Sequence, residues 1–142
     1  MIDQEQDAKL GIVVIHNRIR FLADNRQTEE ALELHHESEA LYARMAGPLV
    51  RIKFSWLKGQ ILQANGDLKA ALDVFSSIRQ NYLEQDNQYE AALVSLDLAS
   101  TLDKLGYRKE TRRLAAAAFR EMTARRVTRE ALAALILLRN SA

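Results

Sequence analysis

The sequence repeats at an interval of 40 residues, and this period restricts the possible folds more than any other feature. Arg26, Gly66 and Gly106 stand at equivalent positions. Leu22, Leu62 and Leu102 precede them by four residues, Ala31, Ala71 and Thr111 follow them by five, and His35, Phe75 and Ala115 follow by nine. A helix-turn-helix unit that returns at such a period is typical of a helical solenoid. We therefore predict an all-α chain built from antiparallel helix hairpins.

Helix-breaking residues divide the chain into seven segments. Gly66 and Gly106 stand where a helix is expected to end in a left-handed residue, and Gly47-Pro48 is expected to end one helix and begin the next. Thr28 and Thr128 have the side chain of an N-cap, and each precedes glutamate. The predicted helices are about 8–24, 28–45, 48–65, 68–84, 88–105, 108–123 and 128–140.

The middle unit resembles a tetratricopeptide repeat (TPR). Its matching residues are Gly59, Leu62, Gly66, Asp67, Ala71 and Phe75, at the spacings that this family uses for helix crossing, turn and packing. The resemblance covers essentially the whole chain, as units 8–47, 48–87 and 88–127 plus a terminal helix at 128–140. The longer period is similar to that of TPR arrays in large bacterial regulatory and scaffold proteins. The outer units depart from the pattern, since Ile19 and Ala99 replace the crossing glycine, and Lys58 stands where an apolar residue is usual.

This resemblance implies a right-handed solenoid, a single domain over 1–142 taken from a longer array, and a concave groove that binds a peptide or helix of a partner protein. The groove candidates fall on the first helix of each unit. They are Val13, His16, Asn17 and Arg20, then Lys53, Trp56, Leu57 and Gln60, then Leu93, Leu96, Asp97 and Ser100. The lysine and asparagine clamp that some family members use for carboxylate tails is not present at these positions. We predict a more apolar groove in which Trp56 either contacts the ligand or packs between helices.

Two helices carry apolar residues nearly all the way round. "GIVVI" at 11–15 and "ALAALILL" at 131–138 lack the polar outer face that a terminal solenoid helix needs. Either the chain belongs to a longer array, or these helices bind another copy of the chain. A third interpretation is that long side chains cover the apolar surface within a monomer.

Charge is distributed unevenly along the chain. Residues 1–50 carry five Lys and Arg against nine Asp and Glu, and residues 101–142 carry ten against four, which gives −4 and +6. A head-to-tail contact would suit this asymmetry. An alternative function is that of a nucleic-acid-associated regulator that uses a basic C-terminal hairpin. Its cations are Arg108, Lys109, Arg112, Arg113, Arg120, Arg125, Arg126 and Arg129.

Catalytic and metal-binding patterns are weak. Glu33-x-x-His36 has the spacing of a di-iron ligand pair, but a second such pair is missing from the sequence, and the repeat predicts His35 to be a packing residue. The chain has no cysteine, and it has neither a nucleophile elbow nor a glycine-rich phosphate loop. We predict a cytoplasmic, non-catalytic scaffold that uses no cofactor and has no membrane segment.

Overall fold

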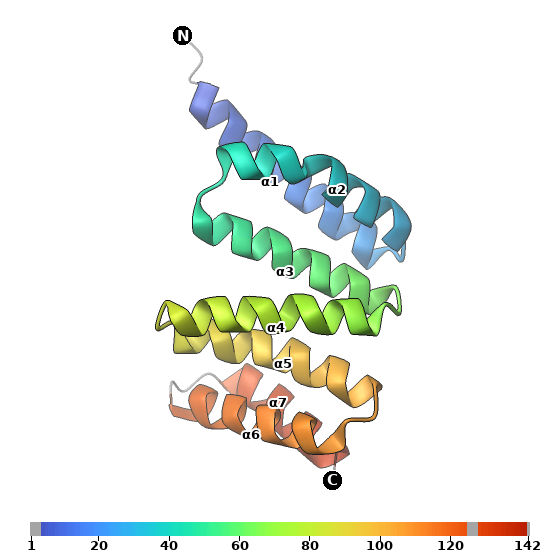
Figure 1. The fold of residues 1–142 in the computed structure, drawn as a ribbon, viewed down its shortest axis with the longest axis vertical. Coiled ribbons are helices and arrows are strands. Elements are labelled where there is room, and N and C mark those ends of the chain that lie inside the picture. The colour runs from blue at the N-terminus through green and yellow to red at the C-terminus, as the bar shows by residue number, and fades with distance from the viewer. Residues whose placement is uncertain (1–3, 125–127, 142) are drawn as a thin grey trace. The chain divides into compact units, whose positions relative to one another are not determined.

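The computed structural model describes residues 4–124 and 128–141, and every element of secondary structure in these ranges is an α-helix (Figure 1). The helices are α1 Gln4–Asp24, α2 Thr28–Met45, α3 Pro48–Ala64, α4 Leu68–Glu84, α5 Gln88–Lys104, α6 Arg108–Ala124 and α7 Thr128–Asn140. The all-α prediction is confirmed. The predicted boundaries agree closely, except that α1 begins several residues before its predicted start.

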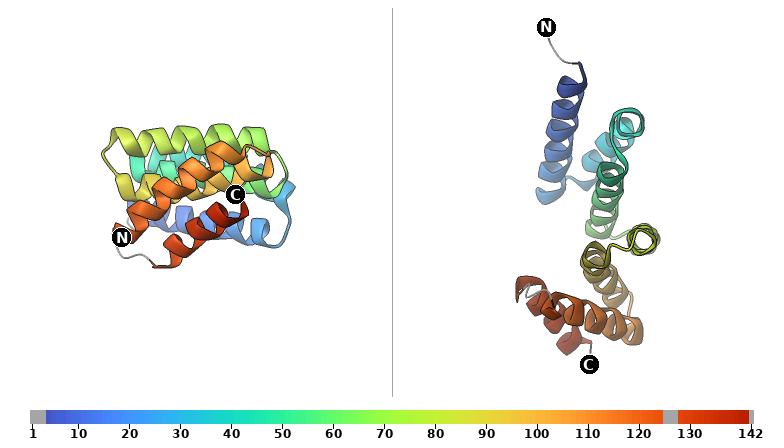
Figure 2. Two further views of the ribbon diagram at one scale, coloured as in Figure 1. Left: turned by 90° about the horizontal axis from the view of Figure 1, so that it is seen from below. Right: turned by 90° about the vertical axis from the view of Figure 1, so that its left-hand side faces the viewer.

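The helices form two compact units. The first unit, Met1–Asp67, contains α1, α2 and α3, and the second, Leu68–Ala142, contains α4 to α7. Within each unit consecutive helices pack together and run antiparallel, and α1 also contacts α3 as α5 contacts α7 (Figures 1 and 2). The boundary between the units falls inside the predicted repeat 48–87, so the pairing of α3 with α4 as one hairpin stays a prediction.

Four of the connections between helices contain the same type of turn. Arg26, Gly66, Asp86 and Gly106 all have positive φ, at 63°, 86°, 57° and 87°. At Gly66 the amide donates to the Gln63 carbonyl (3.1 Å), and the next amide, of Asp67, donates to the Leu62 carbonyl (2.9 Å). The other three turns repeat both hydrogen bonds, which together form a Schellman motif. The predicted left-handed helix ends at Gly66 and Gly106 are confirmed, and Asp86 supplies one that the sequence analysis missed.

The connection between α2 and α3 differs from these four. Ala46 is extended, Gly47 precedes the helix and Pro48 is its first residue, as predicted. The predicted N-cap at Thr28 is wrong, because Gln27 occupies the cap position and makes no side-chain cap bond. The Thr28 hydroxyl instead donates to Oδ1 of Asn65 at 2.6 Å, which links the start of α2 to the end of α3. For the predicted N-cap at Thr128, where α7 begins, the preceding residue lies outside the described residues.

Positions that the repeat predicted to pack between helices are buried. The small position is filled by Ala31, Ala71 and Thr111, and the position four residues later by His35, Phe75 and Ala115. Ile19 and Ala99, which replace the expected crossing glycine, are buried as well. The Thr111 hydroxyl donates to the Tyr107 carbonyl at 2.8 Å, so this polar side chain is satisfied inside the second unit.

An aromatic stack forms the centre of the first unit. The Phe54 ring of α3 lies between two rings of α2, those of His35 and Tyr42, with centroid distances of 3.7 Å on both sides. The Tyr42 hydroxyl donates to the carbonyl of Ile12 in α1 at 3.2 Å. The predicted burial of His35 is confirmed, but its ring stacks on α3 rather than lying only within the hairpin of α1 and α2.

Candidate binding groove

Two neighbouring hollows lie on the face of the first unit that α1 and α3 share. His16 and Lys53 line both of them. The first is completed by Ile12, Val13, Asn17, Tyr42 and Val50, and the second by Arg20, Trp56, Leu57 and Gln60. The structure therefore brings together every groove candidate of the first two repeats. We call this surface the α1–α3 groove.

Helical spacing explains why these residues meet. His16, Asn17 and Arg20 follow Val13 by three, four and seven residues, so all four lie on one side of α1. Lys53, Trp56, Leu57 and Gln60 repeat this spacing on α3. Because α1 contacts α3 directly, the two stripes form the walls of one groove.

The two hollows differ in chemistry. Ile12, Val13 and Val50 make the first mainly apolar. The second contains the cations Arg20 and Lys53 beside the indole of Trp56. The groove thus combines an apolar hollow with a cationic one, and His16 lies where they join.

His16 is held in its neutral form. Partial burial lowers the pKa of its imidazole, and the positive charges of Arg20 and Lys53 lower that pKa further. At neutral pH the positive charge of the groove therefore resides on Arg20 and Lys53. A bound anion would oppose their effect and raise the pKa of His16 again.

Two of the predicted groove residues on α3 have different roles. Leu57 is buried, so it forms the floor of the groove rather than an exposed contact. Trp56 is half-buried and lines the cationic hollow, which leaves part of its ring accessible. Trp56 thus serves both of the roles that the sequence analysis considered for it.

The groove candidates of the third repeat belong to the second unit. Leu96, Asp97 and Ser100 lie half-buried on one side of α5. Their continuation of the α1–α3 groove remains a prediction.

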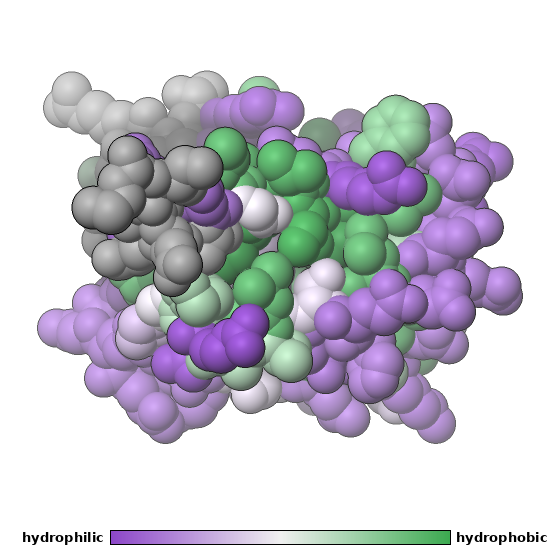
Figure 3. Space-filling model, turned by 90° about the horizontal axis from the view of Figure 1, so that it is seen from above, coloured by the Kyte–Doolittle hydropathy of each residue, from purple (hydrophilic) through white to green (hydrophobic). Residues whose placement is uncertain are grey.

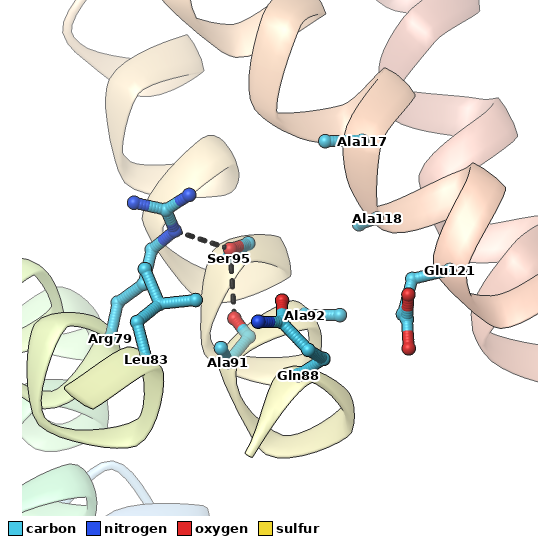
Figure 4. A pocket seen from close by; sticks show the side chains of 9 residues that line it. All are labelled: Arg79, Leu83, Gln88, Ala91, Ala92, Ser95, Ala117, Ala118 and Glu121. Atoms are coloured by element: carbon cyan, nitrogen blue, oxygen red, sulfur yellow. Dashed lines mark hydrogen bonds between the residues drawn. The ribbon is translucent and has the colours of Figure 1, made fainter. Parts of the chain in front are cut away.

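The second unit has a hollow that the sequence analysis missed (Figure 4). It lies between α4, α5 and α6, where Ala92, Ala117 and Ala118 leave space. The Nε of Arg79 donates to the Ser95 hydroxyl at 2.9 Å, and that hydroxyl donates to the Ala91 carbonyl at 2.8 Å. Ser95 is therefore engaged in structural hydrogen bonds. The alanine run at 115–118 was the available signal, since small side chains facing one another leave unfilled volume.

The histidine pair of α2 separates into a buried and an exposed residue. His36 is exposed, and its Nδ1 lies 3.6 Å from Oε2 of Glu39, whose other oxygen lies 3.9 Å from Nζ of Lys58. Among the described residues, no group of three His, Asp or Glu side chains is placed to hold a metal ion. No described helix is both long enough and apolar enough to cross a membrane.

Comparisons with protein-family models, with curated proteins and with solved structures found no match. The likeness to TPR proteins therefore rests on the repeat spacing and the residues at its packing and turn positions.

Proposed function

We propose that this chain is a TPR-type helical solenoid that binds a segment of a partner protein in the α1–α3 groove. The observation that carries the proposal is the meeting of two hollows at His16 and Lys53. Concave surfaces with an apolar part and a few convergent polar groups are the usual form of ligand sites. Repeating helix hairpins provide a rigid support for such a surface.

The chemistry of the groove indicates the kind of segment that it binds. An apolar side chain would fill the hollow lined by Ile12, Val13 and Val50. An acidic side chain next to it would reach Arg20 and Lys53, where a charge-assisted hydrogen bond is stronger than a neutral one. The partner segment therefore pairs an apolar residue with an acidic one.

Selection from a random peptide display library tests this function. The wild-type chain should enrich peptides that place Asp or Glu beside a large apolar residue. Lys53→Glu should abolish their binding, whereas Lys104→Glu, an exposed lysine of α5, should preserve it. Peptides that bind equally well to Lys53→Glu, or a selection that enriches no sequence class, would contradict the proposal.

A second candidate function rests on α6. Its five cations, Arg108, Lys109, Arg112, Arg113 and Arg120, are all exposed. An exposed basic helix can neutralise phosphates, and such binding weakens steeply as salt concentration rises. Tight, salt-sensitive binding of labelled RNA or DNA that is lost in an Arg112→Glu/Arg113→Glu variant would favour this function over the groove.

A further inference from the structure

Val14 and Phe21 of α1 depart from the burial pattern of the other helices with the same place in the repeat. Val14 corresponds to Phe54, Val94 and Ala134, and Phe21 corresponds to Ile61, Thr101 and Ser141. These six equivalents are at most 5% exposed, whereas Val14 is 59% exposed and Phe21 is 62% exposed. On α1, therefore, a face that is buried on α3, α5 and α7 meets solvent.

On α3 the covering element is α2, the helix that comes before, whose His35 and Tyr42 stack on Phe54. On α1, the described chain has no preceding helix, and Leu10 joins Val14 and Phe21 to make an apolar stripe at helical spacing. Figure 3 looks onto α1 and α2 and shows hydrophobic side chains gathered within a hydrophilic surround. This stripe fits an apolar helix.

Helix α7 has the complementary exposed face. Leu132, Leu135 and Ile136 are about half exposed, and their positions in the repeat correspond to Ile12, Ile15 and His16 of α1. On that side of α1, Ile12 and Ile15 pack with α2, the helix that follows, and the backbone of Ile12 accepts the hydrogen bond of Tyr42, while His16 lies at the edge that lines the α1–α3 groove. On α7, the described chain has no following helix. The face is therefore one on which an antiparallel helix packs elsewhere in the repeat.

The charges beside the two apolar faces have opposite sign. Exposed Asp7 and Asp24 lie at the two ends of the stripe on α1 and Arg18 lies at its edge, while the exposed cations Lys9 and Arg20 lie on other sides of that helix. Exposed Arg129 and Arg139 lie beside the apolar residues of α7, and Glu130 is on the other side of that helix. The −4 of residues 1–50 comes from α2, where five glutamates stand against Arg44, so the charge argument for α1 rests on Asp7 and Asp24 alone.

We propose that α7 of one copy packs on α1 of a second copy, so that the chains associate head to tail. Each copy then covers an apolar face that is exposed on the other, and the arginines of α7 face the aspartates of α1. Such a contact joins two different surfaces, so it extends from copy to copy unless the rotation between copies closes a ring. The proposal is independent of the groove, because it uses other faces of the chain.

Sedimentation velocity on two variants and their mixture tests this pairing. Phe21→Asp disables the α1 face and leaves α7 intact, and Leu132→Arg does the reverse. Because both residues are exposed, circular dichroism should show unchanged helix content. The wild-type chain should form larger species as its concentration rises. Each variant alone should remain a monomer, while an equimolar mixture should form a dimer through the one intact face of each.

Several results would overturn the proposal. A wild-type chain that stays monomeric up to millimolar concentration has no such contact. If Leu132→Arg still dimerises, the contact joins α1 to α1, and if Phe21→Asp still dimerises, it joins α7 to α7. A mixture that stays monomeric also contradicts the head-to-tail pairing. As a further check, Asp24→Arg should weaken the association, and adding Arg129→Asp should restore it, because the start of α7 lies beside the end of α1 in an antiparallel pair.

Discussion

The Nε2 atom of His35 lies 2.8 Å from the carbonyl oxygen of Phe54, and the rings of these two residues stack almost in parallel. Because a carbonyl can only accept, Nε2 carries the proton of the neutral imidazole. The other nitrogen, Nδ1, is buried and has no hydrogen-bond partner among the described residues. Protonating it would place a charge and an unsatisfied donor in the core of the first unit.

The first prediction concerns acid stability. Burial lowers the pKa of His35 below its ordinary value, and the carbonyl bond to Phe54 opposes this only in part. The unfolded chain therefore takes up a proton near the ordinary pKa, about 6.5, before the folded chain does. The contribution of neutral His35 to the free energy of unfolding is therefore fully present above that pH and is lost as the pH falls below it. Urea unfolding at about pH 7 and about pH 5 measures the difference.

A variant series assigns this effect to His35. Phe75 stands at the equivalent repeat position and is buried, so His35→Phe offers a ring of similar shape without a titrating group. It should reduce the acid sensitivity of unfolding. Burial also lowers the pKa of His16, so His16→Gln is the matched control. It should remove a smaller part of the acid sensitivity of unfolding than His35→Phe does. An unchanged pH profile in His35→Phe would exclude the buried imidazole as the cause.

The second prediction concerns Phe54. Its replacement by alanine removes the ring that lies between His35 and Tyr42, and truncating a buried phenylalanine costs about 3–5 kcal/mol. Phe21→Ala, measured at a concentration where the chain is monomeric, is the matched control, because that ring is largely exposed and its loss should change stability by less than about 0.5 kcal/mol. Urea unfolding of both variants measures the contrast. Equal losses would mean that the aromatic stack is not the core of the first unit.

The third prediction separates two glycines. Gly66 has φ 86°, so Gly66→Ala would force a side chain into the left-handed region and should destabilise the chain by about 1–2 kcal/mol. Gly11 lies within α1, and an added Cβ there meets no atom within 4 Å. Gly11→Ala should therefore stabilise by about 0.5–1 kcal/mol. Thermal unfolding should show a lower midpoint for Gly66→Ala and a higher midpoint for Gly11→Ala. Shifts in the same direction would contradict the assigned backbone conformations.

The fourth prediction extends the turn argument to Asp86. This residue adopts φ 57° at the end of α4, the position that glycine fills in the turns at 66 and 106. Asp86→Gly should therefore stabilise the chain slightly, because glycine adopts this conformation without steric strain. Thermal unfolding of Asp86→Gly beside Asp86→Ala should place the glycine variant above both the wild type and the alanine variant. A lower midpoint for Asp86→Gly would contradict this.

Much of the fold could be predicted because the strongest signals are local. The helix ends at Gly66 and Gly106 follow from the steric freedom of glycine. The helix start after Gly47 follows from Pro48, whose fixed φ and missing N–H suit the first position of a helix. Asp86 was missed because aspartate adopts positive φ only sometimes, and the sequence does not say where. The N-cap predicted at Thr28 was wrong because Gln27 occupies the cap position, and the Thr28 hydroxyl bonds to Asn65, a residue 37 positions away that no local pattern reveals.

The residues of the α1–α3 groove could be predicted from the sequence, but its shape could not. His16 and Lys53 could be placed on one surface because the resemblance to TPR proteins implies that the first helix of each unit lines a shared groove. The division into an apolar and a cationic hollow could not be predicted, because it depends on how Val50 of α3 sits beside Ile12 and Val13 of α1. The burial of Leu57 was also hidden, since one helical stripe contains both floor and wall residues.

The chain has one tryptophan, Trp56, and it lines the cationic hollow of the groove, so its fluorescence reports on that site directly. Titration of a display-selected acidic and apolar peptide, with binding followed in parallel by calorimetry, is the most direct test of the proposed function. We predict a saturable change in Trp56 emission in the wild-type chain and in Lys104→Glu, and none in Lys53→Glu. Calorimetric binding without a change in Trp56 emission, or binding that persists in Lys53→Glu, would contradict the α1–α3 groove as the binding site.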